Sequence, residues 1–281
     1  MVTAVRSYKS RKLATQGKTR QLNLLAMYEK LAESYAQKLE FDVLHVVVQQ
    51  NLLPFLWKNG HLGGRTFDVL MTALPMSEIQ KRLDRAHSLH PESTTLGDFR
   101  VDQSLLQAET EALSHARKIV TPHSDIAELF ISRSELLDWN VPSANPPERP
   151  KNKKPRIVFP AATVGRKGCY ELREALRGID VTIVLLGPLI EGADFWNGFE
   201  TEKGGEWLPN ADLVALPAHV EHKPRRLLIA AANGIPVIAS KACGVENVKG
   251  IESIDETDAM QLREKILQHI AFIQSGRPAS I

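Results

Sequence analysis

Cysteine is scarce in this chain, and long hydrophobic runs are missing. The 281 residues include only two cysteines, Cys169 and Cys243, which lie far apart and lack the spacing of metal ligands. A disulfide framework and a zinc site are therefore not expected, and a reducing, cytoplasmic setting fits best. No segment reaches the roughly 18 apolar residues of a membrane span, and the N-terminus lacks the apolar core of a signal peptide.

An excess of charge of one sign is also missing. The 35 basic and 33 acidic side chains leave a formal net charge of +2, so no overall field favours binding to nucleic acid. The first twenty residues differ, because they contain no acidic residue and six basic ones: Arg6, Lys9, Arg11, Lys12, Lys18 and Arg20. Such a segment is typical of a solvated arm, and the alternative is a peripheral contact with an anionic membrane surface.

Strand and helix patterns alternate in both halves of the chain. In the first half we expect strands over residues 41–48, 67–70 and 118–121, and helices over 22–39, 51–57, 103–115 and 124–130, the last capped by Ser124. In the second half we expect strands over 156–159, 181–186, 213–216, 236–239 and 248–254, and helices over 168–176, 227–232 and 258–273. This alternation predicts an α/β protein with two doubly wound, Rossmann-like domains that face a cleft.

Proline and charged residues concentrate between Val141 and Pro155, a segment that contains five prolines. Such composition is typical of a domain boundary. We therefore divide the chain into an N-terminal domain over residues 1–145 and a C-terminal domain over residues 146–281. A domain of about 100 to 150 residues can bury its own core.

The segment from Ala211 to Ser240 is the most informative part of the sequence. It reads as a short buried strand, a polar loop over residues 217–224, a helix of small residues, and a Gly-x-Pro turn into another strand. Ligands of open α/β sheets bind beyond the carboxyl ends of the strands. The polar loop, which contains Glu221 and Lys223, is therefore expected to contact a ligand.

A second motif, Val164-Gly165-Arg166-Lys167-Gly168, follows the predicted strand over residues 156–159. Its two glycines allow the backbone to approach a ligand closely, and the helix that follows presents N–H groups to an anion. Arg166 and Lys167 would neutralise the charge of two phosphates. Replacing both by alanine is expected to abolish nucleotide binding and leave the fold intact. The alternative is that this motif is only a polar turn.

Together, these motifs resemble the donor-binding region of retaining glycosyltransferases of the GT-B fold, of the family-4 type. In that family a loop glutamate, a helix and a Gly-x-Pro-Val turn recur together, and the glutamate matches Glu221. The resemblance implies a nucleotide-sugar donor, no metal or other cofactor, and Glu221 as the catalytic residue. The chain contains no Asp-x-Asp tripeptide, as expected if basic side chains replace a divalent cation. The resemblance also implies a set of donor-binding residues: Gly165, Arg166, Lys167, Lys223, Arg225 and Trp207. Trp207 would stack on the base, and the alternative is that it covers the edge of the sheet.

The chain departs from the family pattern in the second domain. The family places a second glutamate, which commonly binds the donor ribose, eight residues after the first, and here that position is Ile229. An apolar side chain cannot bind ribose hydroxyls. Arg225 and Arg226 also stand where the family has small or apolar residues.

In the first domain the resemblance is partial. The Asp42–His45 segment resembles the family's Asp-x-x-His strand, and residues 109–119 resemble its glutamate-bearing helix and strand. The usual opening strand with its glycine-rich turn is missing, so we expect a reduced first sheet with an exposed edge. His45, on an apolar strand, is expected in the core, and His123 follows a strand end and could face the cleft.

Three functions remain open at this stage. The first is transfer of a sugar from a nucleotide-sugar donor to an acceptor that enters from the first domain. Ile229 and the missing opening strand favour a second, a weakened relative that binds a nucleotide or glycan or serves as a partner subunit. The third, an epimerase of similar architecture, lacks a clear acid–base pair.

Overall fold

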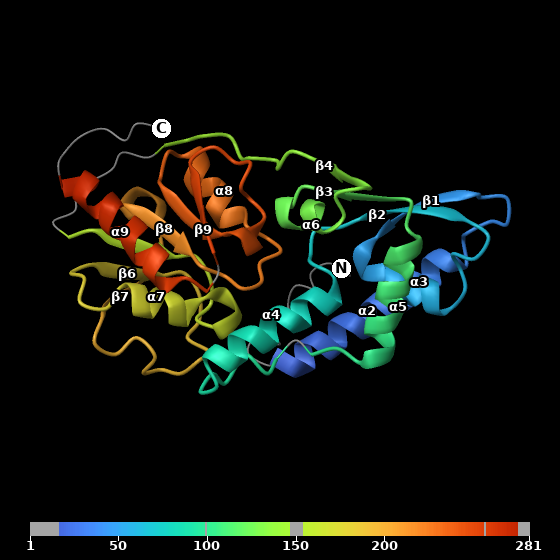
Figure 1. Cartoon of the computed structure of the whole chain (residues 1–281), viewed down its shortest axis with the longest axis horizontal. Coiled ribbons are helices and arrows are strands. Elements are labelled where there is room, and N and C mark those ends of the chain that lie inside the picture. Colours follow the sequence, from blue (N-terminus) through green and yellow to red (C-terminus); the bar gives the residue numbers. More distant parts are fainter. Residues whose placement is uncertain (1–16, 99, 147–153, 256, 275–281) are drawn as a thin grey trace.

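The computed structural model describes residues 17–98, 100–146, 154–255 and 257–274. Most of the basic N-terminal segment and the middle of the proline-rich connection therefore lie outside the described residues. Figure 1 shows two domains side by side, each built on a parallel sheet. No helix in the described ranges is long and apolar enough to cross a membrane.

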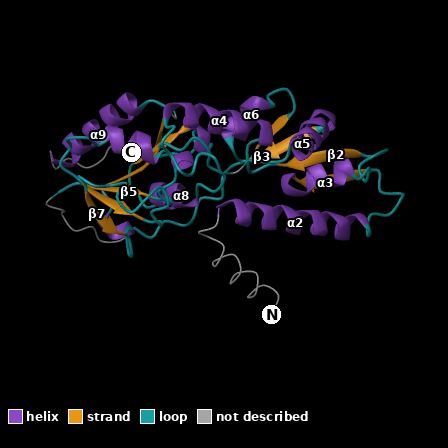
Figure 2. Ribbon diagram, turned by 90° about the horizontal axis from the view of Figure 1, so that it is seen from below, coloured by secondary structure: helices purple, strands orange, loops and turns teal. Residues whose placement is uncertain are grey.

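The first domain contains a four-stranded sheet of order β1-β2-β3-β4. Its strands are β1 (His45–Gln49), β2 (Thr66–Leu70), β3 (Lys118–Thr121) and β4 (Ser134–Leu136). Its helices are α2 (Gly17–Ala36), η1 (Gln50–Leu52), α3 (Leu53–Lys58), α4 (Met76–Leu89), α5 (Gln103–His115) and α6 (Ser124–Leu129). Figure 2 shows that α2 begins near the middle of the molecule and runs outward along the first domain.

The second domain contains a six-stranded sheet of order β10-β9-β8-β5-β6-β7. Its strands are β5 (Arg156–Phe159), β6 (Thr182–Leu185), β7 (Glu200–Lys203), β8 (Leu213–Leu216), β9 (Val237–Ser240) and β10 (Ile251–Ile254). Its helices are η2 (Gly165–Lys167), α7 (Cys169–Ala175), η3 (Leu208–Asn210), α8 (Arg225–Ala232), η4 (Lys241–Cys243) and α9 (Ala259–Gln274).

Each domain has its own hydrophobic core. Every residue of β6, β8 and β9 is buried, as expected for central strands of a parallel sheet that is covered on both faces. A third, small apolar cluster joins the domains, because Leu83, Ala86 and Leu96 of the first pack with Val220 of the second. The predicted fold class, two α/β domains with a reduced first one, is confirmed.

Several predicted elements have the same bounds in the structure: the strands over residues 118–121, 156–159 and 213–216, and the helix over 103–115. The predicted cap of α6 is wrong, because His123 is the N-cap residue and Ser124 begins the helix. The strand predicted from Phe41 begins only at His45, and Phe41 lies in a turn with 94% of its surface exposed. The division at residues 145 and 146 stays a prediction.

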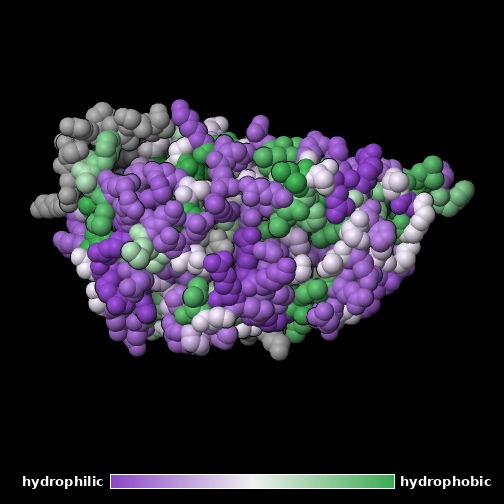
Figure 3. All heavy atoms as spheres, in the orientation of Figure 1, coloured by the Kyte–Doolittle hydropathy of each residue, from purple (hydrophilic) through white to green (hydrophobic). Residues whose placement is uncertain are grey.

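The first sheet has an exposed edge strand, as we expected for a sheet with fewer strands than the family has. β1 lies at the end of the strand order, and only Val48 of its five residues is buried. Leu44 and Val47, 72% and 58% exposed, contribute to the apolar surface over this part of the molecule. Figure 3 shows such residues gathered at the right-hand end, where β1 lies in Figure 1.

Candidate functional site

The Gly165–Gly168 turn and the loop after β8 lie against each other at the carboxyl edge of the second sheet. Gly168 has φ +73°, and a Cβ atom there would lie 1.9 Å from the carbonyl oxygen of Pro217. Only glycine fits such a position. The carbonyl of Arg166 accepts hydrogen bonds from the N–H groups of His219 and Val220, which fixes the turn beside the loop.

Lys167 and Glu221 form a buried ion pair between these two segments. Lys167 Nζ lies 2.9 Å from Glu221 Oε2 and donates a hydrogen bond to the Val220 carbonyl at 2.8 Å. Burial alone would raise the pKa of Glu221, but the Lys167 ammonium and the N–H of Lys223 lower the pKa to about 2. Glu221 is therefore ionised at neutral pH.

The other oxygen of Glu221 is held by the backbone. Its Oε1 accepts hydrogen bonds from the N–H groups of His222 and Lys223, at 2.8 and 2.9 Å. Burial and the nearby Lys167 lower the pKa of His222 to about 3, so its imidazole is neutral. His222 Nδ1 is buried and has no hydrogen-bond partner among the described residues.

This wall of the second domain faces the first domain across a cavity of about 410 Å³. The second domain contributes Arg166, Lys167, Val220, Glu221, His222 and Lys223. The first domain contributes three polar residues, Gln50 and Asn51 directly after β1 and Glu109 of α5. It also contributes a largely apolar surface from α2 and α4 that includes Leu24, Leu25, Tyr28, Ile79 and Leu83. The cavity therefore has one charged wall and one mainly apolar wall.

No protein-family model matches the chain, and no curated protein matches it. Solved structures do match. Sucrose-phosphate synthase from Thermosynechococcus elongatus is 16% identical with a TM-score of 0.60, and the match covers 89% of this chain and 70% of that one. The lipopolysaccharide outer core galactosyltransferase WaaB is 14% identical with a TM-score of 0.54 over 92% of this chain and 72% of that one. Anabaena HepE, solved with UDP, is 14% identical with a TM-score of 0.55, and the match covers 89% of this chain and 73% of that one.

These three proteins are GT-B glycosyltransferases. The chain has the GT-B fold. The expected resemblance is thereby confirmed at the level of the fold. In this GT-B chain the cavity with Lys167 and Glu221 lies between the two domains.

Four of the predicted site residues line the cavity of this GT-B chain, namely Arg166, Lys167, Glu221 and Lys223. Gly165, Trp207 and Arg225 are not among its described lining residues. Trp207 is half-buried and packs against the core of the second domain, and Arg225 is exposed at the start of α8. Their assignment to a donor site stays a prediction.

Gly165 is packed against other residues of the chain and does not face open space. Its N–H donates to Glu191 Oε1 at 2.7 Å and to Thr95 Oγ1 at 2.9 Å. A Cβ atom at this position would lie 2.5 Å from Cγ of Leu96. A first-domain segment that contains Thr95 and Leu96 therefore occupies the space that the missing side chain of Gly165 leaves.

The two histidines singled out in the first domain have different environments. His45 is exposed at the start of β1, where it contacts Thr66 at 2.9 Å and Asp68 at 3.4 Å, so the expected core position is wrong. His123 is fully buried between the domains, and its Nε2 lies 3.2 Å from the Glu221 carbonyl oxygen. Burial lowers the pKa of His123, which keeps the imidazole neutral.

Glu109, the glutamate of the segment that resembles the family's glutamate-bearing helix, lines the cavity, although the sequence assigned it no role there. Its Oε1 accepts from Gln50 Nε2 at 3.2 Å, and its Oε2 accepts from the N–H of Met76 at 2.5 Å. Burial raises the pKa of Glu109 to about 7. A carboxylate in the predicted helix over 103–115, next to apolar positions, was the available signal. Among the described residues, no cluster of three or more His, Cys, Asp or Glu side chains could hold a metal ion.

Proposed function

We propose that this protein transfers a glycosyl group from a nucleotide-sugar donor to an acceptor. The observation that carries the proposal is the charged wall of the interdomain cavity, where Arg166, Lys167 and Lys223 lie around the ionised Glu221. The fold supports it, since Anabaena HepE, a GT-B relative in structure, was solved with UDP and with UDP and glucose.

The chemistry explains the need for such a wall. Breaking a sugar–phosphate bond places negative charge on the leaving diphosphate, and preorganised cations stabilise it as it develops. Arg166, Lys167, Lys223 and Arg225 would supply that charge without a metal ion. Glu221 would face the sugar and stabilise the positive charge that develops on it, and transfer would retain the anomeric configuration.

The remaining assignments complete the proposed donor and acceptor sites. Gly165 would hold in place the turn that presents Arg166 and Lys167 to the donor, since its own N–H is taken by Glu191 and Thr95. Trp207 would stack on the base. The acceptor would enter from the first domain, whose cavity surface is mainly apolar. The two free, buried cysteines fit a cytoplasmic location.

Calorimetric titration with UDP, GDP, ADP, CMP and their common sugar conjugates tests the donor site. We expect one diphosphate nucleotide to bind and Arg166→Ala to weaken its affinity by about 10- to 100-fold, because a hydrogen bond to a charged group typically contributes about 1.5–3 kcal/mol. Arg177→Ala is the matched control, since that guanidinium is 72% exposed and pairs with Glu174 on the surface. Equal affinity in the two variants would refute the assignment of Arg166.

A second candidate function is nucleotide binding without transfer. It is favoured by the contacts of Glu221, whose two oxygens are taken by Lys167 and by two backbone N–H groups. Ile229, in place of the family's second glutamate, favours it too. Such a protein would bind the donor but release no nucleoside diphosphate from it.

A further inference from the structure

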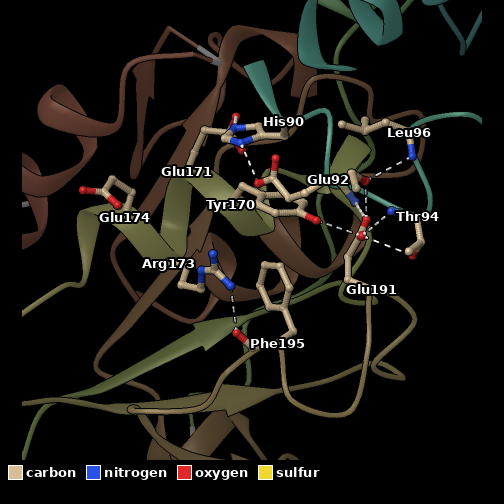
Figure 4. Close-up of polar contacts among 12 residues, drawn as sticks. His90, Glu92, Thr94, Leu96, Tyr170, Glu171, Arg173, Glu174, Glu191 and Phe195 are labelled. Carbon is tan, nitrogen blue, oxygen red and sulfur yellow. Dashed lines mark hydrogen bonds and ion pairs between the residues drawn. The ribbon is translucent and has the colours of Figure 1, made fainter. Parts of the chain in front are cut away.

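A segment of the first domain, Ser93–Leu96, lies against the second domain beside the Gly165–Gly168 turn (Figure 4). It belongs to the connection between α4 and α5. Ser93, Thr95 and Leu96 are buried, although connecting segments usually run exposed over a protein surface. The segment is therefore docked on the other domain.

The Glu191 carboxylate is the centre of this contact. Its Oε1 accepts hydrogen bonds from Ser93 Oγ at 2.8 Å, from the N–H of Gly165 at 2.7 Å and from the Thr95 hydroxyl. Its Oε2 accepts from the N–H of Thr94 and from Tyr170 Oη, both at 3.0 Å. An ionised carboxylate offers about four acceptor sites, so these donors saturate it.

The charge of Glu191 strengthens these bonds. Burial alone would raise the pKa of Glu191, but the hydroxyls of Thr95 and Ser93 and the N–H of Gly165 lower the pKa. The carboxylate is therefore ionised at neutral pH. Hydrogen bonds to an ionised acceptor are roughly twice as strong as neutral ones.

A second carboxylate, Glu171 of α7, contacts His90, the C-cap residue of α4 just before this segment. Its Oε1 lies 3.0 Å from His90 Nε2 and 2.9 Å from His219 Nε2. The His90 ring stacks on Tyr170 with centroids 4.5 Å apart, as Figure 4 shows. His90 thereby joins α4 of the first domain to α7 of the second.

Apolar packing completes the contact. Leu96 is fully buried and packs with Leu83 and Ala86 of α4 and with Val220 of the second domain. It also fills the space in which a side chain at residue 165 would lie. The segment therefore contacts both components of the charged wall, the Gly165–Gly168 turn and the loop after β8.

We propose that Ser93–Leu96 is a latch that holds the two domains together before any ligand binds, and that Glu191 is the positioning residue that joins the latch to the Gly165–Gly168 turn. Release of the latch moves the turn, and with it Arg166 and Lys167, away from the first domain. The latch acts without a donor, so it stands apart from the proposed transfer reaction.

Distance measurement between two spin labels on the ligand-free full chain tests the latch. Labels at Gln107→Cys on α5 and Glu264→Cys on α9 report on the separation of the domains, because α5 belongs to the first domain and α9 to the second. Both positions are exposed and therefore accessible to the label. The native Cys169 and Cys243 are buried and so are protected from labelling. The labelled chain is then compared with variants that add Glu191→Gln, Thr95→Val or Thr95→Ser.

We expect Glu191→Gln and Thr95→Val to shift the distance distribution to longer, broader values, because each removes part of the contact and keeps the side-chain shape. Thr95→Ser retains the hydroxyl and should match the parent chain. An unchanged distribution in folded Thr95→Val and Glu191→Gln would overturn the proposal. A shift in Thr95→Ser equal to that in Thr95→Val would overturn it as well. If Glu191→Gln does not fold, the two Thr95 variants decide the result.

Discussion

At the scale of single residues, the buried Lys167–Glu221 ion pair determines which residues of the charged wall can be replaced without loss of stability. Both side chains are nearly buried, with 10% and 12% of their surface exposed. Removing one member leaves the other as an unpaired buried charge, which is strongly destabilising. The expectation that alanine at residues 166 and 167 leaves the fold intact is therefore revised, and Arg166 alone is the suitable target for binding experiments.

Lys167→Met should lower the free energy of unfolding by about 3–5 kcal/mol, the usual cost of removing one partner from a buried ion pair. Denaturant titration measures this. Lys118→Met is a matched control with little expected effect, because Lys118 pairs with Glu135 on the surface. Adding Glu221→Leu to Lys167→Met should recover part of the loss. A Lys167→Met protein as stable as the control would contradict the importance of the pair.

At the scale of helices and strands, Glu109 connects three elements of the first domain. Its carboxylate extends from α5 to Gln50 in η1 and to the first residue of α4. Gln50 also accepts from the N–H of Ala73 and donates to the carbonyl of Leu74 after β2. One buried carboxyl group thus helps to fix the strand ends that form the cavity.

Stability should fall with rising pH because of Glu109. Burial raises the pKa of Glu109 from 4.5 to about 7, so its stabilising contribution is complete below pH 4.5 and is lost as the pH rises through 7. The loss is roughly 3 kcal/mol, since one pKa unit corresponds to about 1.4 kcal/mol. Denaturant titration from pH 5 to pH 8 should show that the advantage of wild type over Glu109→Gln decreases across this window. A difference that stays constant with pH would contradict this role.

Periodicity and composition were sufficient to predict the bounds of elements whose buried residues follow the sequence pattern, such as β8 and α5. They were insufficient for β7, all four residues of which are exposed, and for α4, which has a Pro75 N-cap and no side-chain cap. In α4 the spacing of Ile79, Leu83 and Ala86 was a usable helical signal. The strand predicted over residues 41–48 failed at its start because apolar residues there face solvent at the sheet edge.

The sequence allowed only part of the candidate site to be predicted. The motifs located Arg166, Lys167 and Glu221, since each lies in a loop after a recognisable strand. They did not indicate that Lys167 and Glu221 pair, nor that Gly165 contacts Thr95 and Glu191. These contacts join residues from 26 to 70 positions apart in the chain, and local patterns carry no information on such pairing.

At the scale of the whole molecule, the two domains contact each other at more than one place. Besides the latch, Trp139 Nε1 and the N–H of Ser124 both donate to the Gly244 carbonyl, at 2.8 and 3.3 Å. The ring of His123 fills the space beside Gly244. Contacts within the protein itself therefore hold the first-domain and second-domain walls of the cavity together, as a preorganised site requires.

The most direct test of glycosyl transfer is the release of nucleoside diphosphate from whichever nucleotide sugar binds. Wild type, Glu221→Gln and the Arg177→Ala control would be compared at saturating donor, with affinity measured in parallel. We expect release by wild type and the control, and a larger loss of turnover than of affinity in Glu221→Gln. Tight donor binding by wild type with no release above the protein-free rate would contradict the proposed transfer and favour a nucleotide-binding protein.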